Sequence, residues 1–325
     1  MSGSMDIHFF EVFEEEEEAL RACLPPEVHA SFHRETVQES GRDRSPGGIV
    51  SIRTQSVIPS DWVHDIDAIL TRSTGYDHVL AFLDETGVDI PSGYLPSYCS
   101  RAVAEHALML WLALLRRLRL QTEHFGKFCR DGLTGGECRG RRLAVVGVGS
   151  IGVEVCAIGE ALGMEVVGVD IVRRHAGVTY AGAEEAIAGS DVVVCAMNLT
   201  RSNRGYFTYG LLKKAKRKAI FVNVARGEFV DPADLLRLLE EGHLGGVGLD
   251  VYPGEALLAG ALRAGTPSGD ASVEAVVRLC SRPDVICTPH NAFNTVESVA
   301  RKAEQSVRQA LHFIAHKTFI WNVPR

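Results

Sequence analysis

The chain has 325 residues, which predicts about two domains at the usual domain size. Hydrophobic residues make up 46% and charged residues 23% of the sequence, a globular composition with enough apolar side chains for sizeable cores. The 34 lysines and arginines are outnumbered by 41 aspartates and glutamates, and the net charge of −7 argues against a nucleic-acid or anionic-membrane partner. The longest apolar run, Ala107–Leu115, is far shorter than the ~20 residues that span a bilayer.

The eight cysteines are scattered along the chain and form no Cys-x-x-Cys pair. This spacing predicts neither a metal site nor a disulfide framework. The N-terminus also lacks the basic flank and apolar core of a secretory signal. Together these features favour a reduced, cytoplasmic setting.

The first hundred residues predict a small α/β unit. Strands are expected at Ile7–Phe10, continued by Val12-Phe13, and at 49–52 and 68–70. Residues 14–18 are five consecutive glutamates, and we expect them to be a solvated helix start, because the helix macrodipole favours acidic side chains there. The third strand leads into Arg72-Ser73-Thr74-Gly75-Tyr76, and a small-residue turn after a strand is where α/β folds place ligands.

The rest of the chain predicts a second, larger α/β unit. A helix is expected over Ser100–Leu118, because apolar residues recur there every three or four positions. Beyond Gly140, strands alternate with helices such as Asp231–Glu241, which starts with a capping aspartate and a first-turn proline. The strands are apolar runs typical of parallel strands covered on both faces, at 143–147, 165–170, 192–196, 219–224, 247–251 and 285–288. The predicted fold class is doubly wound α/β.

A glycine-rich turn, Gly147-Val148-Gly149-Ser150-Ile151-Gly152, lies between the first of these strands and the next helix. In that context glycines permit a tight turn and a close approach to a pyrophosphate, while the helix N-terminus offers N–H groups to the phosphates. Asp170 ends the next strand, 18 residues past Gly152, where a carboxylate can accept both ribose hydroxyls of NAD. It would repel the 2′-phosphate of NADP. Arg173 and Arg174 follow closely and could bind that phosphate, but we favour NAD.

Four segments make the chain similar to the D-2-hydroxyacid dehydrogenase family over nearly its whole length. They are the glycine-rich turn, Asn223–Glu228, Gly248–Val251 and Thr288–His290, in the family's order. The resemblance implies two Rossmann-like domains, with a doubly wound NAD-binding domain at residues 100–293. That domain would be inserted in a smaller, flavodoxin-like catalytic domain made of residues 1–99 and 294–325.

The resemblance also implies a catalytic arginine, glutamate and histidine at Arg226, Glu255 and His290. The chemistry agrees: a planar guanidinium matches the carboxylate of a 2-oxo acid, and a histidine can donate the proton that reduction of the ketone requires. Glu255 would hold the imidazole in one tautomer and stabilise its charged form. Taken singly, the three could be a surface ion pair, a loop acid and a turn residue.

Further contacts are implied by the same resemblance. Cofactor contacts fall on Gly147, Gly149, Ser150, Ile151, Gly152, Asp170, Ala225 and Asp250, with Asp250 facing the nicotinamide carboxamide. The amides of Thr74 and Gly75 would meet the substrate carboxylate, and Tyr98 and Phe293 resemble pocket positions of the D-lactate dehydrogenase branch. For these four residues the alternative is a plain turn or core packing.

The long interval between Glu255 and His290 is also similar to the D-lactate dehydrogenase branch. We therefore expect a cytoplasmic, NAD-dependent oxidoreductase that interconverts a small 2-oxo acid such as pyruvate and its D-2-hydroxy acid. A phosphorylated hydroxyacid is the alternative substrate, with Arg72 as the nearby basic candidate. The other alternative is an NAD-binding corepressor. The absence of a long tail at Arg325 counts against that alternative. The helix from Ser100 resembles the segment that pairs subunits in this family, which implies a homodimer.

Overall fold

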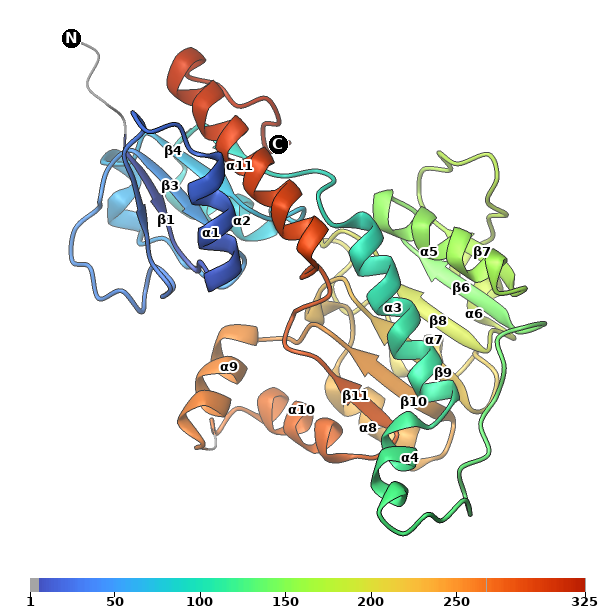
Figure 1. Cartoon of the computed structure of the whole chain (residues 1–325). Helices are drawn as coiled ribbons and strands as arrows, with labels where there is room; N and C mark the ends of the chain where they lie inside the picture. The colour runs from blue at the N-terminus through green and yellow to red at the C-terminus, as the bar shows by residue number, and fades with distance from the viewer. Residues whose placement is uncertain (1–5, 267, 325) are drawn as a thin grey trace. The chain divides into compact units, whose positions relative to one another are not determined.

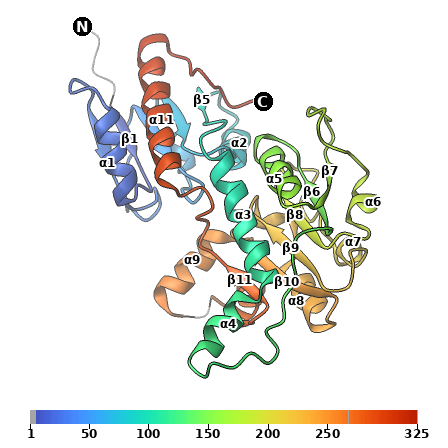
Figure 2. The same cartoon turned by 45° about the vertical axis from the view of Figure 1, so that its right-hand side comes forward.

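The structure is a computed structural model that describes residues 6–266 and 268–324. The expectation about a tail at Arg325 lies outside the described residues. The chain divides into two compact units, one formed by residues 1–99 with 294–325 and the other by residues 100–293. Each unit contains one sheet of parallel strands with helices on its faces, which confirms the doubly wound α/β class (Figures 1 and 2). Among the described residues, no helix is long and apolar enough to span a membrane.

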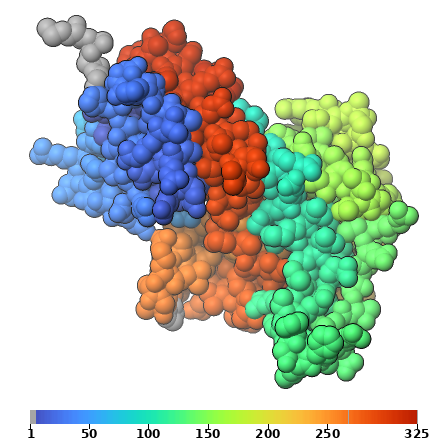
Figure 3. Space-filling model, in the orientation of Figure 1, coloured from blue at the N-terminus to red at the C-terminus, as the bar shows by residue number. Residues whose placement is uncertain are grey.

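The unit formed by both ends of the chain has the flavodoxin-like strand order β2-β1-β3-β4-β5. Helices α1 and α11 pack side by side (Figures 1 and 3). A separate apolar core joins the sheet to η1 and α2. The elements are β1 (Ile7–Phe9), α1 (Glu14–Cys23), β2 (Ala30–Phe32), β3 (Ile49–Ile52), η1 (Ser60–His64), β4 (Ala68–Thr71), α2 (Asp77–Thr86), β5 (Ser92–Gly93) and α11 (Val296–His316).

Two expectations for this unit are wrong. The first strand does not continue through Val12 and Phe13, because Glu11 has φ +57° and turns the chain out of extended geometry. The glutamate run is not wholly solvated, because Glu16 is fully buried beside two cations. A helix that packs on a sheet turns one position in three or four inward, and here that position is an acid.

The unit of residues 100–293 has the strand order β11-β10-β9-β8-β6-β7, and Tyr180 adds a single parallel bridge beyond β7. The order reverses between β6 and β8, the point where doubly wound sheets bind ligands. The elements are α3 (Ser100–Leu115), α4 (Leu118–Phe125), β6 (Arg142–Val146), α5 (Ser150–Ala161), β7 (Glu165–Val169), α6 (Ala183–Ile187), β8 (Val192–Cys195), α7 (Tyr209–Leu212), β9 (Ala219–Asn223), η2 (Gly227–Phe229), α8 (Pro232–Glu240), β10 (Leu244–Leu249), α9 (Glu255–Ala264), α10 (Ala271–Ser281) and β11 (Val285–Cys287).

The expected six strands of this unit are all present within a few residues of their predicted bounds. The helix from Ser100 is shorter than predicted, because Arg117 has φ +52° and separates α3 from α4. Helices α3 and α5 lie against one face of the sheet, and α8 and α10 pack together beside β10 and β11 (Figure 1).

The expectation of no disulfide is wrong. Cys280 at the end of α10 and Cys287 at the end of β11 form one, with their Cα atoms 5.7 Å apart. The two cysteines are seven residues apart, a spacing with no motif, and they meet because the chain reverses between helix and strand. The other six cysteines are free.

Candidate active site

The glycine-rich turn joins β6 to the first turn of α5. Gly147 has φ +93°, which L side chains rarely adopt, and a Cβ on Gly152 would collide with the carbonyl oxygen of Gly147. A Cβ on Gly149, in contrast, would meet no atom within 4 Å. Ser150 and Ile151 start the helix directly after this open space. The turn therefore fits a pyrophosphate, which would accept from the N-terminal amides of a 12-residue helix.

Asp170 follows β7, the neighbour of β6 in the sheet. Its Oδ2 accepts a hydrogen bond of 2.7 Å from the amide of Val148, inside the glycine-rich turn. The carboxylate thus lies where a ribose attached to a bound pyrophosphate would bring its hydroxyls. Of the nearby arginines, Arg173 has its guanidinium 5.9 Å from the ring centre of Tyr180, and Arg174 is exposed.

Arg226 stands three residues beyond the end of β9, just before η2. Asn223, the last residue of β9, fixes this loop: its side-chain amide donates to the carbonyl of Arg226 at 2.8 Å, and its side-chain oxygen accepts from the amide of Ala225 at 3.1 Å. Nη1 of Arg226 donates to the carbonyl of Ala225 at 2.9 Å. Arg226 as a whole is partly exposed, its Nη2 atom is buried, and these hydrogen bonds hold the loop that carries it.

His290 and Glu255 face each other beyond the ends of β11 and β10. The Nδ1 atom of His290 lies 2.8 Å and 2.9 Å from the two carboxylate oxygens of Glu255. A carboxylate can only accept, so Nδ1 carries the proton and Nε2 is the atom left for chemistry. The side chains of His290 and Glu255 are 17% and 21% exposed, so the pair is shielded yet reachable.

The strands β9, β10 and β11 are neighbours and parallel, so the predicted catalytic residues follow the same edge of one sheet. Gly227 permits a close backbone contact at this edge. A Cβ at Gly227 would collide with the backbone of Tyr252 and Pro253, so the loop of Arg226 and the segment that leads to Glu255 pack backbone to backbone.

Asp250 is 1% exposed and holds the segment that carries His290. Its carboxylate accepts hydrogen bonds from the hydroxyl of Thr288 at 2.6 Å and from the amides of Asn291 and Ala292 at 2.8 Å and 2.9 Å. The His290 turn is therefore fixed on both sides. The predicted contact of Asp250 with a nicotinamide carboxamide stays a prediction.

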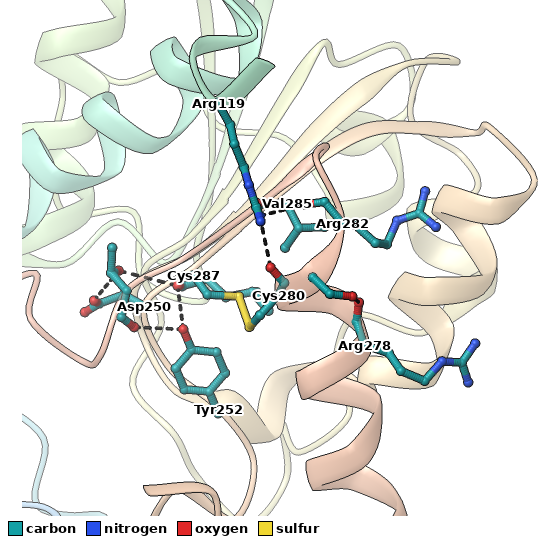
Figure 4. Close-up of a disulfide and its surroundings, with 11 residues drawn as sticks. Arg119, Asp250, Tyr252, Arg278, Cys280, Arg282, Val285 and Cys287 are labelled. Carbon is teal, nitrogen blue, oxygen red and sulfur yellow. Dashed lines mark hydrogen bonds between the residues drawn. A yellow bond between two sulfur atoms is a disulfide. The ribbon is translucent and has the colours of Figure 1, made fainter. Parts of the chain in front are cut away.

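Two ring side chains that the sequence prediction missed support the same segment. Tyr252 Oη donates to the carbonyls of Leu249, at 3.1 Å, and Thr288, at 2.8 Å (Figure 4). Nε2 of His106, on α3, lies 3.0 Å from the Thr288 hydroxyl and 3.6 Å from Asp250. Burial lowers the pKa of His106, and the Asp250 carboxylate opposes part of that shift. The sequence signal that could have identified His106 is a histidine on the buried side of an apolar helix.

The turn that contains Thr74 and Gly75 belongs to the other compact unit. It follows β4, and the Ser73 hydroxyl donates to the carbonyl of Gly75 at 2.5 Å. The Thr74 hydroxyl lies 3.7 Å from the sulfur of Cys99. The turn thus has a fixed shape at a strand end.

Tyr98, in the same unit, is 5% exposed, and its carbonyl accepts from Ser298 Oγ at 3.0 Å and Arg301 Nε at 2.8 Å. Burial raises the pKa of Tyr98 well above its usual value, so its hydroxyl stays protonated. Phe293, the last residue of the other unit, is 7% exposed. Tyr98 and Phe293 belong to different units, and the expectation that both line a substrate pocket stays a prediction.

Arg72 is fully buried and is therefore no phosphate ligand. Its guanidinium donates to Glu16 at 2.9 Å, to the carbonyl of Ser51 at 2.9 Å and to the carbonyl of Phe10 at 2.6 Å. Lys302 lies 2.6 Å from the same oxygen of Glu16. This removes the basic side chain on which the phosphorylated-substrate alternative depended.

Within residues 6–266 and 268–324, no group of three or more His, Cys, Asp or Glu could hold a metal ion.

Comparison with known proteins shows which family the chain resembles. The profile of the family described as "D-isomer specific 2-hydroxyacid dehydrogenase, NAD binding domain" matches residues 108–292. The D-lactate dehydrogenase of Streptococcus pyogenes serotype M1 is 32% identical over 235 residues, 70% of each chain. The glycerate dehydrogenase of Methylorubrum extorquens is 30% identical over 264 residues, 78% of this chain and 77% of that one.

A solved structure is similar over almost the whole length. It is the D-lactate dehydrogenase of Aquifex aeolicus in complex with NAD and lactic acid, with a TM-score of 0.82 and 26% sequence identity. The match covers 97% of this chain and 98% of that one.

Proposed function

We propose that this chain, which belongs to the D-isomer-specific 2-hydroxyacid dehydrogenase family, reduces a small 2-oxo acid such as pyruvate to the D-2-hydroxy acid. As a member of that family it is an NAD-dependent enzyme that interconverts 2-oxo acids and D-2-hydroxy acids. The observation that carries the proposal is the contact of 2.8 Å between His290 and Glu255. This acid–base pair follows β11 and β10, and β10 is the neighbour of β9, the strand that leads to Arg226.

Residues of the 100–293 unit would hold the cofactor. The turn of Gly147–Gly152 would bind the pyrophosphate, Asp170 the ribose, and Ala225 and Asp250 the nicotinamide end. Bound NAD in its reduced form supplies the hydride. We propose a preference for NAD over NADP, because a 2′-phosphate would meet the carboxylate of Asp170 where it contacts the glycine-rich turn.

Arg226 would bind the carboxylate of the 2-oxo acid through two N–H groups of its planar guanidinium. His290 then donates its Nε2 proton to the carbonyl oxygen as negative charge develops there, and Glu255 stabilises the imidazolium before that transfer. In the reverse direction the neutral imidazole takes the proton of the hydroxyl group. Asn223 and Asp250 act as positioning residues for Arg226 and His290, through the loops that they fix.

The remaining contacts are proposed for the substrate side. The unit of residues 1–99 and 294–325 would be the substrate domain, with the amides of Thr74 and Gly75 binding the substrate carboxylate. Tyr98 and Phe293 would line the pocket for the substrate side chain. The position of the Thr74 turn after a parallel strand supports this, because such ends are where α/β folds bind ligands.

We also propose that the enzyme is a cytoplasmic homodimer. An exposed apolar surface is typical of a subunit interface. Large apolar side chains of α3, α4 and the loop that follows are exposed in this way, namely Met109, Leu112, Leu118, Phe125 and Phe128. Light scattering should give twice the mass of the 35.3 kDa chain. A monomer would contradict the dimer without affecting the reaction.

The reaction is tested with a panel of 2-oxo acids, followed by the loss of NADH absorbance. Pyruvate and other small, unbranched 2-oxo acids should be reduced, and chiral chromatography should find the D-hydroxy acid. Phosphohydroxypyruvate should be a poor substrate, because Arg72 is buried in an ion pair. A preference for the phosphorylated acid, or an L product, would overturn the proposal.

A further inference from the structure

The disulfide Cys280–Cys287 lies at the base of the segment that carries the acid–base histidine. Cys287 is the last residue of β11 and stands three positions before His290. Strand β11 is three residues long and, among the described residues, is the edge strand of its sheet, paired with β10 alone. A short edge strand has few ladder hydrogen bonds, and the sulfur bridge to α10 adds a covalent bond at its end (Figure 4).

We propose that Cys280 and Cys287 are a reversible thiol–disulfide site that sets the activity of the enzyme through the His290 segment. The natural reactant is a small disulfide and its thiol, such as the glutathione couple. The inference rests on the proposed function, because it takes His290 as the proton donor. The disulfide form is the active one, since in it His290 faces Glu255 at 2.8 Å.

The path from sulfur to histidine is short and continuous. The residue after Cys287 is Thr288, whose amide donates to the carbonyl of Leu249 at 2.9 Å and whose hydroxyl donates to Asp250 at 2.6 Å. The carbonyl of Thr288 accepts from Tyr252 at 2.8 Å. All of these contacts depend on where the end of β11 lies, and reduction removes the one covalent bond among the contacts that hold it.

The turn that leads from Cys280 to the start of β11 has hydrogen bonds of its own, so the two thiols stay near each other after reduction although the end of β11 is no longer bonded to α10. Nη1 of Arg119 donates to the carbonyls of Cys280, Arg282 and Val285 at 2.9 Å, 2.8 Å and 3.1 Å (Figure 4). Arg282 also forms two hydrogen bonds with Asp284. Both cysteines are partly exposed, so a small thiol or disulfide can reach them. The pair therefore meets both requirements of reversible exchange, which are proximity and access.

The exchange balances. The thiolate of one cysteine attacks a sulfur of the small disulfide, an S–S bond breaks, and one small thiol leaves. The second cysteine thiolate attacks the mixed disulfide on the protein sulfur and releases the second small thiol. The protein pair loses two electrons and the small disulfide gains them, while the two protons of the protein thiols end on the released thiols.

The test poises the enzyme, with NADH bound, in glutathione buffers of graded thiol-to-disulfide ratio without oxygen. Alkylation and peptide mass spectrometry measure the Cys280–Cys287 disulfide, and the same samples give kcat and KM for pyruvate and Kd for NADH. We expect kcat to fall roughly twofold to thirtyfold on reduction, the range that coupling through a packed network produces. The kcat curve should share its midpoint with the disulfide curve, and Kd for NADH should not change.

Variants separate this site from other thiols. Cys280→Ser and Cys287→Ser should each have the low kcat of the reduced enzyme at every ratio, and either one suffices if the other does not fold. Cys23→Ser removes an exposed free cysteine of the other unit and should behave as the wild type.

Two outcomes would contradict the inference and are distinguishable. Equal kcat at all ratios, while the disulfide forms and breaks, would overturn the redox site and leave the proposed function intact. No reduction of any 2-oxo acid at any ratio would overturn the proposed function, and the redox inference with it.

Discussion

Two arginines occupy corresponding places in the two units. Arg72 follows β4 and Arg226 follows β9, and each precedes a turn that contains glycine. Arg72 is fully buried, and all three of its guanidinium nitrogens donate to the protein. Arg226 is partly exposed, and Nη1 donates within its own loop.

The difference between these arginines comes from a partner far away in the sequence. Glu16, 56 residues from Arg72, is buried between Arg72 and Lys302. Burial alone would raise the pKa of Glu16, but the positive charges of Arg72 and Lys302 outweigh it and lower the pKa to about 2. The same motif of strand, arginine and small turn is therefore structural in one unit, and in the other we propose that it binds the substrate.

The largest expected effect is on the acid–base group. His290→Gln should lower kcat for pyruvate reduction by about 10²–10⁴-fold, the usual contribution of general acid catalysis. Fluorescence titration should give an unchanged Kd for NADH, since His290 is assigned to the substrate. A variant with normal turnover would remove His290 from the reaction.

The buried arginine should matter for stability instead. Arg72→Gln should lower the free energy of unfolding by about 3–5 kcal/mol, because Glu16 loses a partner inside the protein. Arg226→Gln is the matched control and should change it by at most about 0.5 kcal/mol, as for a side chain outside a packed core. Urea unfolding measures both. Equal losses of unfolding free energy in the two variants would contradict the contrast between the two arginines.

The same cluster predicts an acid dependence. The folded-state pKa of Glu16 is lowered from 4.5 to about 2, so its stabilisation is complete above pH 4.5 and is lost as pH falls toward 2. The difference in unfolding free energy between wild type and Glu16→Gln should shrink over that window. A difference that stays constant from pH 6 to pH 2 would show that Glu16 has no shifted pKa.

The smallest effect is expected at the cofactor site. Wild type should prefer NADH to NADPH by about tenfold or more in kcat/KM, and Asp170→Ala should reduce that ratio, because one charged repulsion is worth about 1.4 kcal/mol. Arg174→Ala is the control and should leave the ratio unchanged. If the wild type prefers NADPH, the neighbouring arginines and not Asp170 determine the choice of cofactor.

Much of the fold could be predicted because its signals are local. A parallel strand is a continuous apolar run, so the expected 219–224 agrees with Ala219–Asn223. The glycine-rich turn could be predicted because strand, turn and helix are adjacent in sequence. Pairs distant in sequence had no such signal: the partner of Glu16 and the bond between Cys280 and Cys287 depend on how helices pack on the sheets.

The contrast between the two arginines can be measured directly with oxamate, an unreactive amide analogue of pyruvate that keeps its carboxylate. Calorimetry would give its Kd for the NADH complexes of wild type, Arg226→Lys and Arg72→Lys. Losing one charge-assisted hydrogen bond costs about 1.5–3 kcal/mol, so Arg226→Lys should weaken oxamate binding by at least about tenfold. Arg72→Lys, where folded, should bind oxamate as wild type does. Unchanged binding in Arg226→Lys, or a comparable loss in folded Arg72→Lys, would contradict the assignment of Arg226 as the substrate's carboxylate ligand.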